Sequence, residues 1–338
     1  MKELSFWGLL TGSTLDEISN ELRELHALEG EMSSVKAHIK MLQSPDMEVV
    51  KAAVKDLLKG SAGGLPVIEQ VAFQFGAAHQ NMPLVTACLR ADVPCWVHGD
   101  AGSGKSTAAE NAANLLNLPF GFISVAPTTT KSDLYGFIDA GGAYRATMFR
   151  KLFEGGGVFL IDEIDNGNPS VITVLNAALA NGMCAFPDGN VKRSKNARIV
   201  AAANTIGRGA DIRYVGRNAL DATTLDRFAF VRMDIDENLE GALAGEPYDA
   251  SKMTNIGAGG QVTVDDWFRF VKRVRHAVNE LGIEHVVSPR ATLNGSRLIH
   301  VGVGRTHLEN MCIWKGIRPE DREKITAYVA DHRGGDDA

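Results

Sequence analysis

The chain has 338 residues, 45% of them hydrophobic, which is enough for a sizeable core and more than one packed unit. Its formal net charge of −6 argues against a protein coated in basic surface, although a local basic groove is compatible with it. The four cysteines have neither CxxC pairing nor zinc-type spacing with histidine, and no run of about 18 apolar residues occurs. We therefore expect a globular cytoplasmic protein with reduced thiols and with neither an export signal nor a membrane span.

The first 60 residues are predicted to form a helical N-terminal extension. Thr14 and Glu17 have the spacing of a capping box, and apolar residues then recur three and four apart as far as Leu42. This repeat is short and changes phase once, so a packed helical hairpin or a partner-docking helix is favoured over a long coiled coil. The segment GSAGG at 60–64 is typical of a flexible joint and predicts a domain boundary.

Short apolar runs separated by helical patterns follow over residues 65–237. The runs are PCWVHG, PFGFISV, GVFLID, RIVAAAN and FAFVRMDI. Because continuous apolar strands that alternate with helices suit a parallel sheet covered on both faces, we predict an α/β core over 65–237. A polar, glycine-rich stretch runs from Asp236 to Gly260, and helical patterns from about Val264 predict a small helical lid over 260–332.

The stretch VHGDAGSGKST, residues 97–107, fits the pattern G-x-x-x-x-G-K-[ST] between a predicted strand and a predicted helix. Its glycines allow successive N–H groups to face a phosphate, and the N-terminus of the helix adds partial positive charge. Lys105 is then expected to reach the β and γ phosphates of a nucleotide and Ser106 to bind magnesium. The candidate nucleotide-binding residues are Gly99, Asp100, Ala101, Gly102, Ser103, Gly104, Lys105, Ser106 and Thr107.

The run GVFLIDEID ends in three acids, Asp162, Glu163 and Asp165. We expect this strand to lie beside the strand that feeds the phosphate loop, which brings Asp162 to the carboxyl edge of the sheet and into the magnesium shell. Glu163 is expected to orient and activate the attacking water. A divalent cation and a lysine opposite make this negative charge tolerable. Asp165 has no assigned duty, and a helix N-cap or a surface acid is its expected role.

In their order and spacing, these segments resemble the AAA+ ATPases. Within that family they resemble the MoxR group and its relatives, which include the CobS-type cobaltochelatase ATPase and the CbbQ and NorQ activators. The resemblance covers roughly residues 65–303 and rests on GDAGSGKST, TTTKSDLYG, FRKLFEGGGVFLIDEID, RIVAAANT, YVGRNALDATTLDRF and SPRAT. It implies a P-loop NTPase core with a parallel sheet and a helical lid, and the use of ATP and Mg²⁺.

The resemblance also implies roles for three polar residues. Asn204 matches the sensor-one residue that positions the water or contacts the γ phosphate, although an asparagine that ends a strand in a turn is common. Arg290 matches the sensor-two arginine directed at the phosphates, with Pro289 in the first turn of a lid helix. Arg227 matches an arginine finger that acts on the ATP of a neighbouring subunit; the alternative is a surface pair with Asp226.

The implied assembly is a homo-oligomer, a hexameric ring, in which Arg208, Arg213 and Arg217 compete with Arg227 for the role in trans. A chaperone or chelatase motor that remodels a protein client, with a von Willebrand A type companion, is the favoured function. The alternative is a nucleic-acid motor or loader related to the MCM helicases, as in phage replication or packaging. A scaffold with little turnover is disfavoured because Glu163 and Arg227 are both present.

The segment CAFPDGNVKRSK predicts a hairpin, which in the family points toward the central pore together with the insert at 136–144. Lys192, Arg193 and Lys195 on its return arm could contact nucleic acid. We favour solvation or a protein contact, since the chain is acidic and no aromatic residue is interleaved with these bases.

Overall fold

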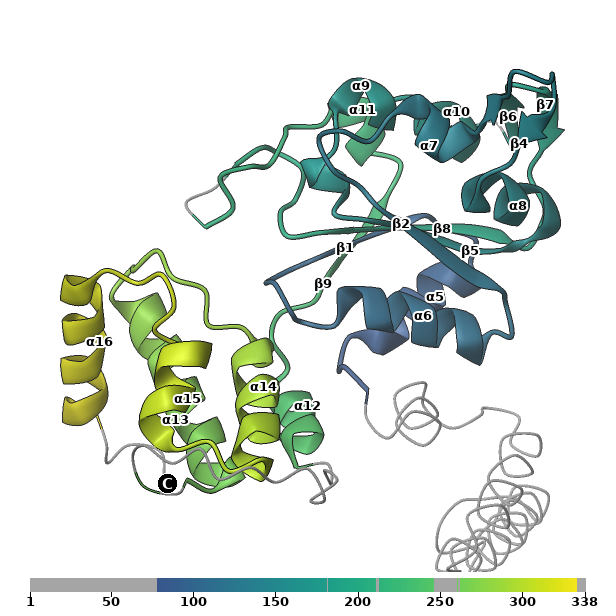
Figure 1. The fold of residues 1–338 in the computed structure, drawn as a ribbon. Coiled ribbons are helices and arrows are strands. Elements are labelled where there is room, and N and C mark those ends of the chain that lie inside the picture. The colour runs from purple at the N-terminus through teal and green to yellow at the C-terminus, as the bar shows by residue number, and fades with distance from the viewer. Residues whose placement is uncertain (1–77, 181, 211–212, 246–259, 261, 333–338) are drawn as a thin grey trace, which may run out of the picture. The chain divides into compact units, whose positions relative to one another are not determined.

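The computed structural model describes residues 78–180, 182–210, 213–245, 260 and 262–332 (Figure 1). The chain separates into two units, Met1–Pro66 and Val67–Ala338, and only the second contains described residues. The helices predicted for the first 60 residues and the glycine-rich joint therefore lie outside the described residues. The domain limits 1–60, 65–237 and 260–332 stay predictions.

A five-stranded parallel sheet in the order β2-β5-β8-β1-β9 forms the α/β core. All five runs predicted as strands form it: β1 (Cys95–His98), β2 (Phe120–Ser124), β5 (Gly157–Asp162), β8 (Ala197–Ala203) and β9 (Ala229–Arg232). One expectation is wrong, because β8 lies between β1 and β5 and the acidic strand does not adjoin the strand that feeds the loop.

The register of the sheet nevertheless brings the predicted site residues to one edge. His98 of β1 lies beside Ala203 of β8, so both strands end together, and Ile161 of β5 lies beside Ala201. The residues that follow these three strands therefore begin at the same carboxyl edge, where ligands bind in open α/β sheets.

The two faces of the sheet carry separate apolar cores, because side chains alternate along buried strands. Val158 and Leu160 of β5 face the core that includes α5 (Met82–Arg90) and α6 (Lys105–Leu115). Phe159 and Ile161 face the opposite core, which includes Phe149 of α8 (Met148–Gly155). Figure 1 shows α5 and α6 on one side of the sheet and α8 on the other.

Short elements connect the strands on the side of α8. They are α7 (Lys131–Tyr135), β3 (Phe137–Ile138), β4 (Tyr144–Arg145), the 3-10 turn η1 (Ile164–Asn166), α9 (Pro169–Ile172), α10 (Leu175–Ala180), β6 (Met183–Phe186), β7 (Gly189–Lys192) and α11 (Ala222–Leu225). The predicted hairpin is confirmed, since β6 pairs antiparallel with β7. A second hairpin, β3 with β4, occupies the insert at 136–144.

Arg150 of α8 connects these two hairpins. Its guanidinium carbon lies 4.8 Å from the ring centre of Phe186 and 5.6 Å from that of Tyr144, and the group is 3.4 Å from a carboxylate oxygen of Asp188. Because Arg150 is buried, these contacts tie both hairpins to the helix packed on the sheet.

The C-terminal lid contains five helices among the described residues. They are α12 (Glu237–Ala244), α13 (Val264–Glu280), α14 (Pro289–His300), α15 (Arg305–Cys312) and α16 (Pro319–Asp331). The first of them, α12, was not predicted and lies in the polar, glycine-rich stretch that begins at Asp236. The side chain of Asp236 caps this helix by accepting a hydrogen bond from Leu239 N. Buried Arg275 of α13 donates two hydrogen bonds to buried Glu240 of α12, at 2.8 and 2.9 Å, which ties the two helices together.

All four cysteines are free thiols; Cys95, Cys184 and Cys312 are buried and Cys88 is half-buried. Among the described residues, no helix combines the length and the apolar composition needed to cross a membrane.

Candidate active site

The phosphate loop joins β1 to α6, and its glycines are needed for different reasons. At Gly99 a Cβ would lie 2.0 Å from the carbonyl oxygen of Met233, so the chain there leaves no room for a side chain. Gly104 has space around it, but its φ of +87° is left-handed, and it directly precedes the first residue of α6. Inside the loop, the buried Ser103 hydroxyl has no hydrogen-bond partner among the described residues. A turn with this shape and an unpaired donor fits an anionic ligand.

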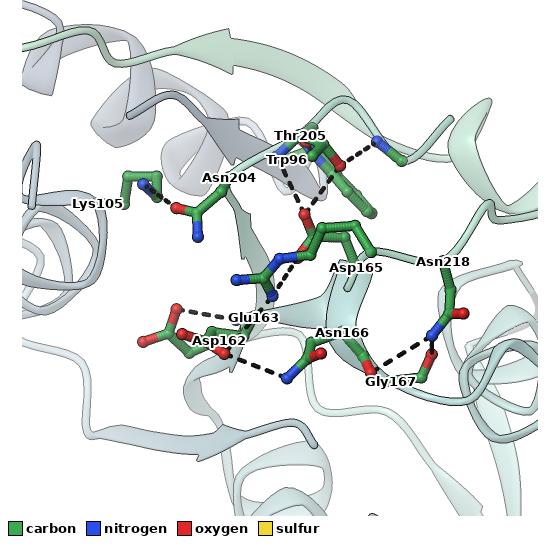
Figure 2. A network of polar contacts seen from close by, with 12 residues as sticks. Trp96, Lys105, Asp162, Glu163, Asp165, Asn166, Gly167, Asn204, Thr205 and Asn218 are labelled. Atoms are coloured by element: carbon green, nitrogen blue, oxygen red, sulfur yellow. Dashed lines mark hydrogen bonds and ion pairs between the residues drawn. The ribbon is translucent and has the colours of Figure 1, made fainter. Parts of the chain in front are cut away.

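Lys105 is buried at the start of α6 and uses all three of its donors within the chain. Its Nζ donates to the carbonyls of Gly99 and Asp100, each at 2.8 Å. It also donates to Asn204 Oδ1 at 3.0 Å (Figure 2). Burial lowers the pKa of Lys105 to about 8, partly opposed by nearby carboxylates, of which Asp162 has the largest effect. A phosphate bound to Lys105 Nζ in place of these carbonyls would supply a negative charge next to the buried ammonium, which has no directly bonded carboxylate among the described residues.

Ser106 and Asp162, the two predicted magnesium ligands, are in direct contact. Ser106 Oγ donates to Asp162 Oδ2 at 2.7 Å, while the other oxygen of Asp162 accepts from the backbone N–H of Glu163 at 3.0 Å. A hydroxyl and a carboxylate at the end of a phosphate loop are hard oxygen donors of the kind that Mg²⁺ prefers. These residues therefore fit the metal.

A cavity of about 410 Å³ connects the loop, the ends of β5 and β8, and the lid. Its walls bring together residues predicted from separate motifs, including Glu163, Asn204 and Arg290. Two apolar residues, Leu243 of α12 and Leu293 of α14, were not predicted, because apolar positions on amphipathic helices do not reveal which surface they face. The lining residues are Ala101, Gly102, Gly104, Lys105, Ser106, Thr107, Asp162, Glu163, Ala203, Asn204, Leu243, Arg290 and Leu293.

Arg227 does not line this cavity. It follows α11 and donates from Nη1 to the carbonyl of Thr223, and its buried Nε has no hydrogen-bond partner among the described residues. The described part of the chain contains no ion pair between Arg227 and Asp226. Arg227 therefore lies outside the lining of the cavity that holds the phosphate loop of its own chain.

Two of the competing arginines contact acids of their own chain. Arg217 Nη1 lies 3.1 Å from Asp165 Oδ1, and Arg213 Nη1 lies 3.9 Å from Asp100 Oδ1 in the phosphate loop. Arg208 lines a different cavity, which adjoins α11 and β9.

Asp165 is fully buried, so its expected role as an N-cap or a surface acid is wrong. The turn η1 carries it beneath the edge of the sheet, where Oδ2 accepts from Thr205 N at 3.1 Å and from Thr205 Oγ1 at 2.8 Å. Arg217 contacts the other oxygen, and Asn218 N donates to the Asp165 carbonyl at 2.7 Å. These partners were missed because each becomes a neighbour of Asp165 only through the order of the strands. The close spacing of the acids in DEID was the only signal.

A family model described as "AAA domain (dynein-related subfamily)" matches residues 95–228. The matched region starts at β1 and ends just before β9. It contains the phosphate loop, the predicted metal ligand Asp162, the predicted catalytic acid Glu163, and Asn204. These residues are similar to an AAA domain. Domains of that family are ATPase domains, which agrees with the expectation of an AAA+ ATP hydrolase.

Two curated proteins are similar to this chain. The aerobic cobaltochelatase subunit CobS of Sinorhizobium sp is 26% identical over 223 residues, which cover 61% of this chain and 64% of CobS. Midasin of Giardia intestinalis is 27% identical over 162 residues, covering 46% of this chain and 3% of midasin. The chain thus spans just under two thirds of one relative and a small part of the other. The similarity to CobS agrees with the resemblance that the motifs predict.

Among solved structures, NtrX from Brucella abortus matches with a TM-score of 0.40 and 15% identity, covering 80% of this chain and 56% of NtrX. This likeness is too low to support an argument about function.

The affinity for Mg-ATP should fall as the pH rises through about 8. Below this pH Lys105 is protonated and attracts the phosphates; above it the free protein must take up a proton to bind them. Each pH unit above 8 then costs up to about tenfold in Kd. Titration calorimetry between pH 7 and pH 9.5 measures this, with Lys105→Met as the control that cannot titrate. A wild-type affinity that stayed level across this range would contradict the assignment of Lys105.

Proposed function

We propose that this chain assembles into a ring and couples the hydrolysis of Mg-ATP to the remodelling or activation of a protein partner. The observation that carries the proposal is the cavity in which Lys105, Ser106, Asp162, Glu163 and Asn204 meet. It combines donors for phosphates, oxygen ligands for a metal and a half-exposed carboxylate, which are the groups that phosphoryl transfer to water needs.

Each group has a distinct task in this proposal. The backbone of residues 99–107 and Lys105 bind the phosphates, and Ser106 and Asp162 hold magnesium, which when bound neutralises phosphate charge as a Lewis acid. Glu163 accepts a proton from the attacking water, and Asn204 helps to position that water or the γ phosphate. Arg290, on the wall formed by the lid, adds positive charge next to the phosphates.

The site of one chain is completed by a second copy in this proposal. Arg227 lies off its own cavity and pairs with no described carboxylate, so it is suited to contact nucleotide bound by a neighbour. A head-to-tail contact of this kind generates a ring when the rotation between successive copies closes, and we propose a closed ring of six. An arginine supplied in trans can raise the rate of phosphoryl transfer by about 10³-fold or more.

A protein client is favoured over nucleic acid by the two hairpins. Phe137 and Ile138 of β3 and Met183 of β6 are all close to half exposed, so both hairpins present apolar surface. Arg193, one of the three bases on the return arm, is instead occupied by Asp92 and by the carbonyl of Ala197. An enzyme that needs metal insertion is the client class that the similarity to a cobaltochelatase subunit suggests, with a von Willebrand A type companion. A nucleic-acid motor is the second candidate.

Glu163→Gln should lower kcat by about 10²-fold or more while it leaves the Kd for Mg-ATP nearly unchanged, because the carboxamide cannot accept the proton. The resulting ATP-bound rings should retain a protein partner in pull-downs from the source cells, whereas Lys105→Ala rings should retain none. Turnover that DNA or RNA stimulates, without any ATP-dependent protein capture, would favour the motor instead.

Mixing Lys105→Ala with Arg227→Ala subunits should restore ATPase activity that neither variant has alone. In a randomly mixed ring about one interface in four pairs an intact phosphate loop with an intact Arg227 from its neighbour. The matched control mixes Lys105→Ala with Glu163→Gln; both changes affect the same subunit's site, so no recovery is expected. Continued inactivity of the first mixture would rule out action of Arg227 across the interface.

A further inference from the structure

We propose that Arg217 is a positioning residue for the catalytic carboxylate of Glu163 and that the buried Asp165 holds it in place. This inference rests on the hydrolase function proposed above. The guanidinium Nη1 of Arg217 lies 3.1 Å from Asp165 Oδ1 and 3.6 Å from Glu163 Oε2. One nitrogen thus connects the acid expected to receive the proton from water with an acid that has no access to solvent.

Asp165 is a rigid anchor because both of its oxygens have partners. Oδ2 accepts two hydrogen bonds from Thr205, and Oδ1 faces Arg217. A carboxylate with no exposed surface depends on such partners, since an unpaired buried charge is strongly destabilising. The Arg217 side chain is itself only 13% exposed, so its guanidinium has few alternative positions.

The two oxygens of Glu163 have different surroundings. Oε2 lies near two donors, Arg217 Nη1 and Asn166 Nδ2, the latter at 3.4 Å. Oε1 has no partner among the described residues, and the side chain is 45% exposed on the wall of the cavity. One oxygen is therefore held while the other remains available to accept a proton. A general base oriented by a third group follows the same logic as the carboxylate behind a catalytic histidine.

The backbone of Glu163 adds to this constraint. Its φ of +53° is left-handed, a conformation that is uncommon for residues other than glycine and that persists where the surroundings enforce it. The contacts of the carboxylate with Arg217 and Asn166 supply part of that enforcement.

The segment that carries Arg217 also contacts the phosphate loop. Ala101 N donates to Tyr214 Oη at 3.0 Å, and on the other side of Arg217 the Asn218 amide donates to the Gly167 carbonyl at 3.0 Å. The position of Arg217 is thus fixed from both the phosphate loop and the turn after the acidic strand. A contact within its own chain assigns Arg217 to the same subunit's site, in contrast to Arg227.

The test compares kcat and the Kd for Mg-ATP of the full chain in wild type, Arg217→Ala and Arg217→Lys. Arg217→Ala is expected to lower kcat by about 10- to 100-fold with Kd within about twofold, since orientation of the base affects the chemical step. Arg217→Lys keeps the charge without the planar fork and should recover part of the loss.

Asn166→Ala, which removes the second donor to the same oxygen, should give a smaller loss of kcat with the same unchanged Kd. Arg232→Ala is the matched control, because it removes only an exposed pair with Asp234, and it should keep the wild-type kcat.

Several outcomes would overturn the role of Arg217. The first is a kcat of Arg217→Ala equal to or above that of wild type. The second is a weaker affinity for Mg-ATP in Arg217→Ala that Arg217→Lys does not restore. The third is recovery of ATPase activity when Arg217→Ala is mixed with Lys105→Ala subunits, because Arg217 would then act in trans. If Arg217→Ala does not fold, Arg217→Lys and Asn166→Ala decide the question, and a wild-type kcat in both would refute the proposal. A wild type without Mg-dependent turnover would instead refute the hydrolase function, and this role with it.

Discussion

The site depends on two opposite charges, those of Lys105 and Asp162, that lie at one edge of a parallel sheet. Lys105 is buried and its pKa is lowered to about 8, which means that the chain does not fully compensate its charge. The carboxylate of Asp162 lies opposite, in contact with Ser106 rather than with the lysine. An ammonium and a carboxylate held near each other without direct pairing leave space for a ligand that carries both phosphate and metal. This arrangement, more than the glycine pattern alone, identifies a nucleotide site.

A second charge arrangement lies behind the first. Asp165 is buried and contacts two segments of the chain. Its partner Thr205 is the second residue after β8, and its partner Arg217 lies in the segment before α11. Since Asn204 precedes Thr205 and contacts Lys105, the phosphate loop and the acidic strand share one polar network (Figure 2). Lys105 and Glu163 are thus linked through Asn204, Thr205, Asp165 and Arg217 by polar contacts and one peptide bond.

Much of this fold and site could be predicted from local pattern. The strands are continuous apolar runs and the loop has a fixed spacing. Asp162 ends β5, and Glu163 and Asn204 directly follow strands that share an edge. The parts that could not be predicted depend on contacts distant in sequence. The placement of β8 between β1 and β5 follows from the topology of the sheet, and the burial of Asp165 follows from that placement. The helix α12 was missed because glycines and acids near Asp236 are also typical of loops.

The central claim is that Lys105 and the pair Ser106–Asp162 bind opposite parts of one metal-bound triphosphate. The most direct test measures how strongly magnesium increases the affinity for ATP in wild type and in Asp162→Asn. The carboxamide keeps the size of the side chain but removes its charge, so the account predicts that the magnesium effect is largely lost while metal-free ATP binds as well as before or more tightly. An equal magnesium effect in both proteins would contradict the account.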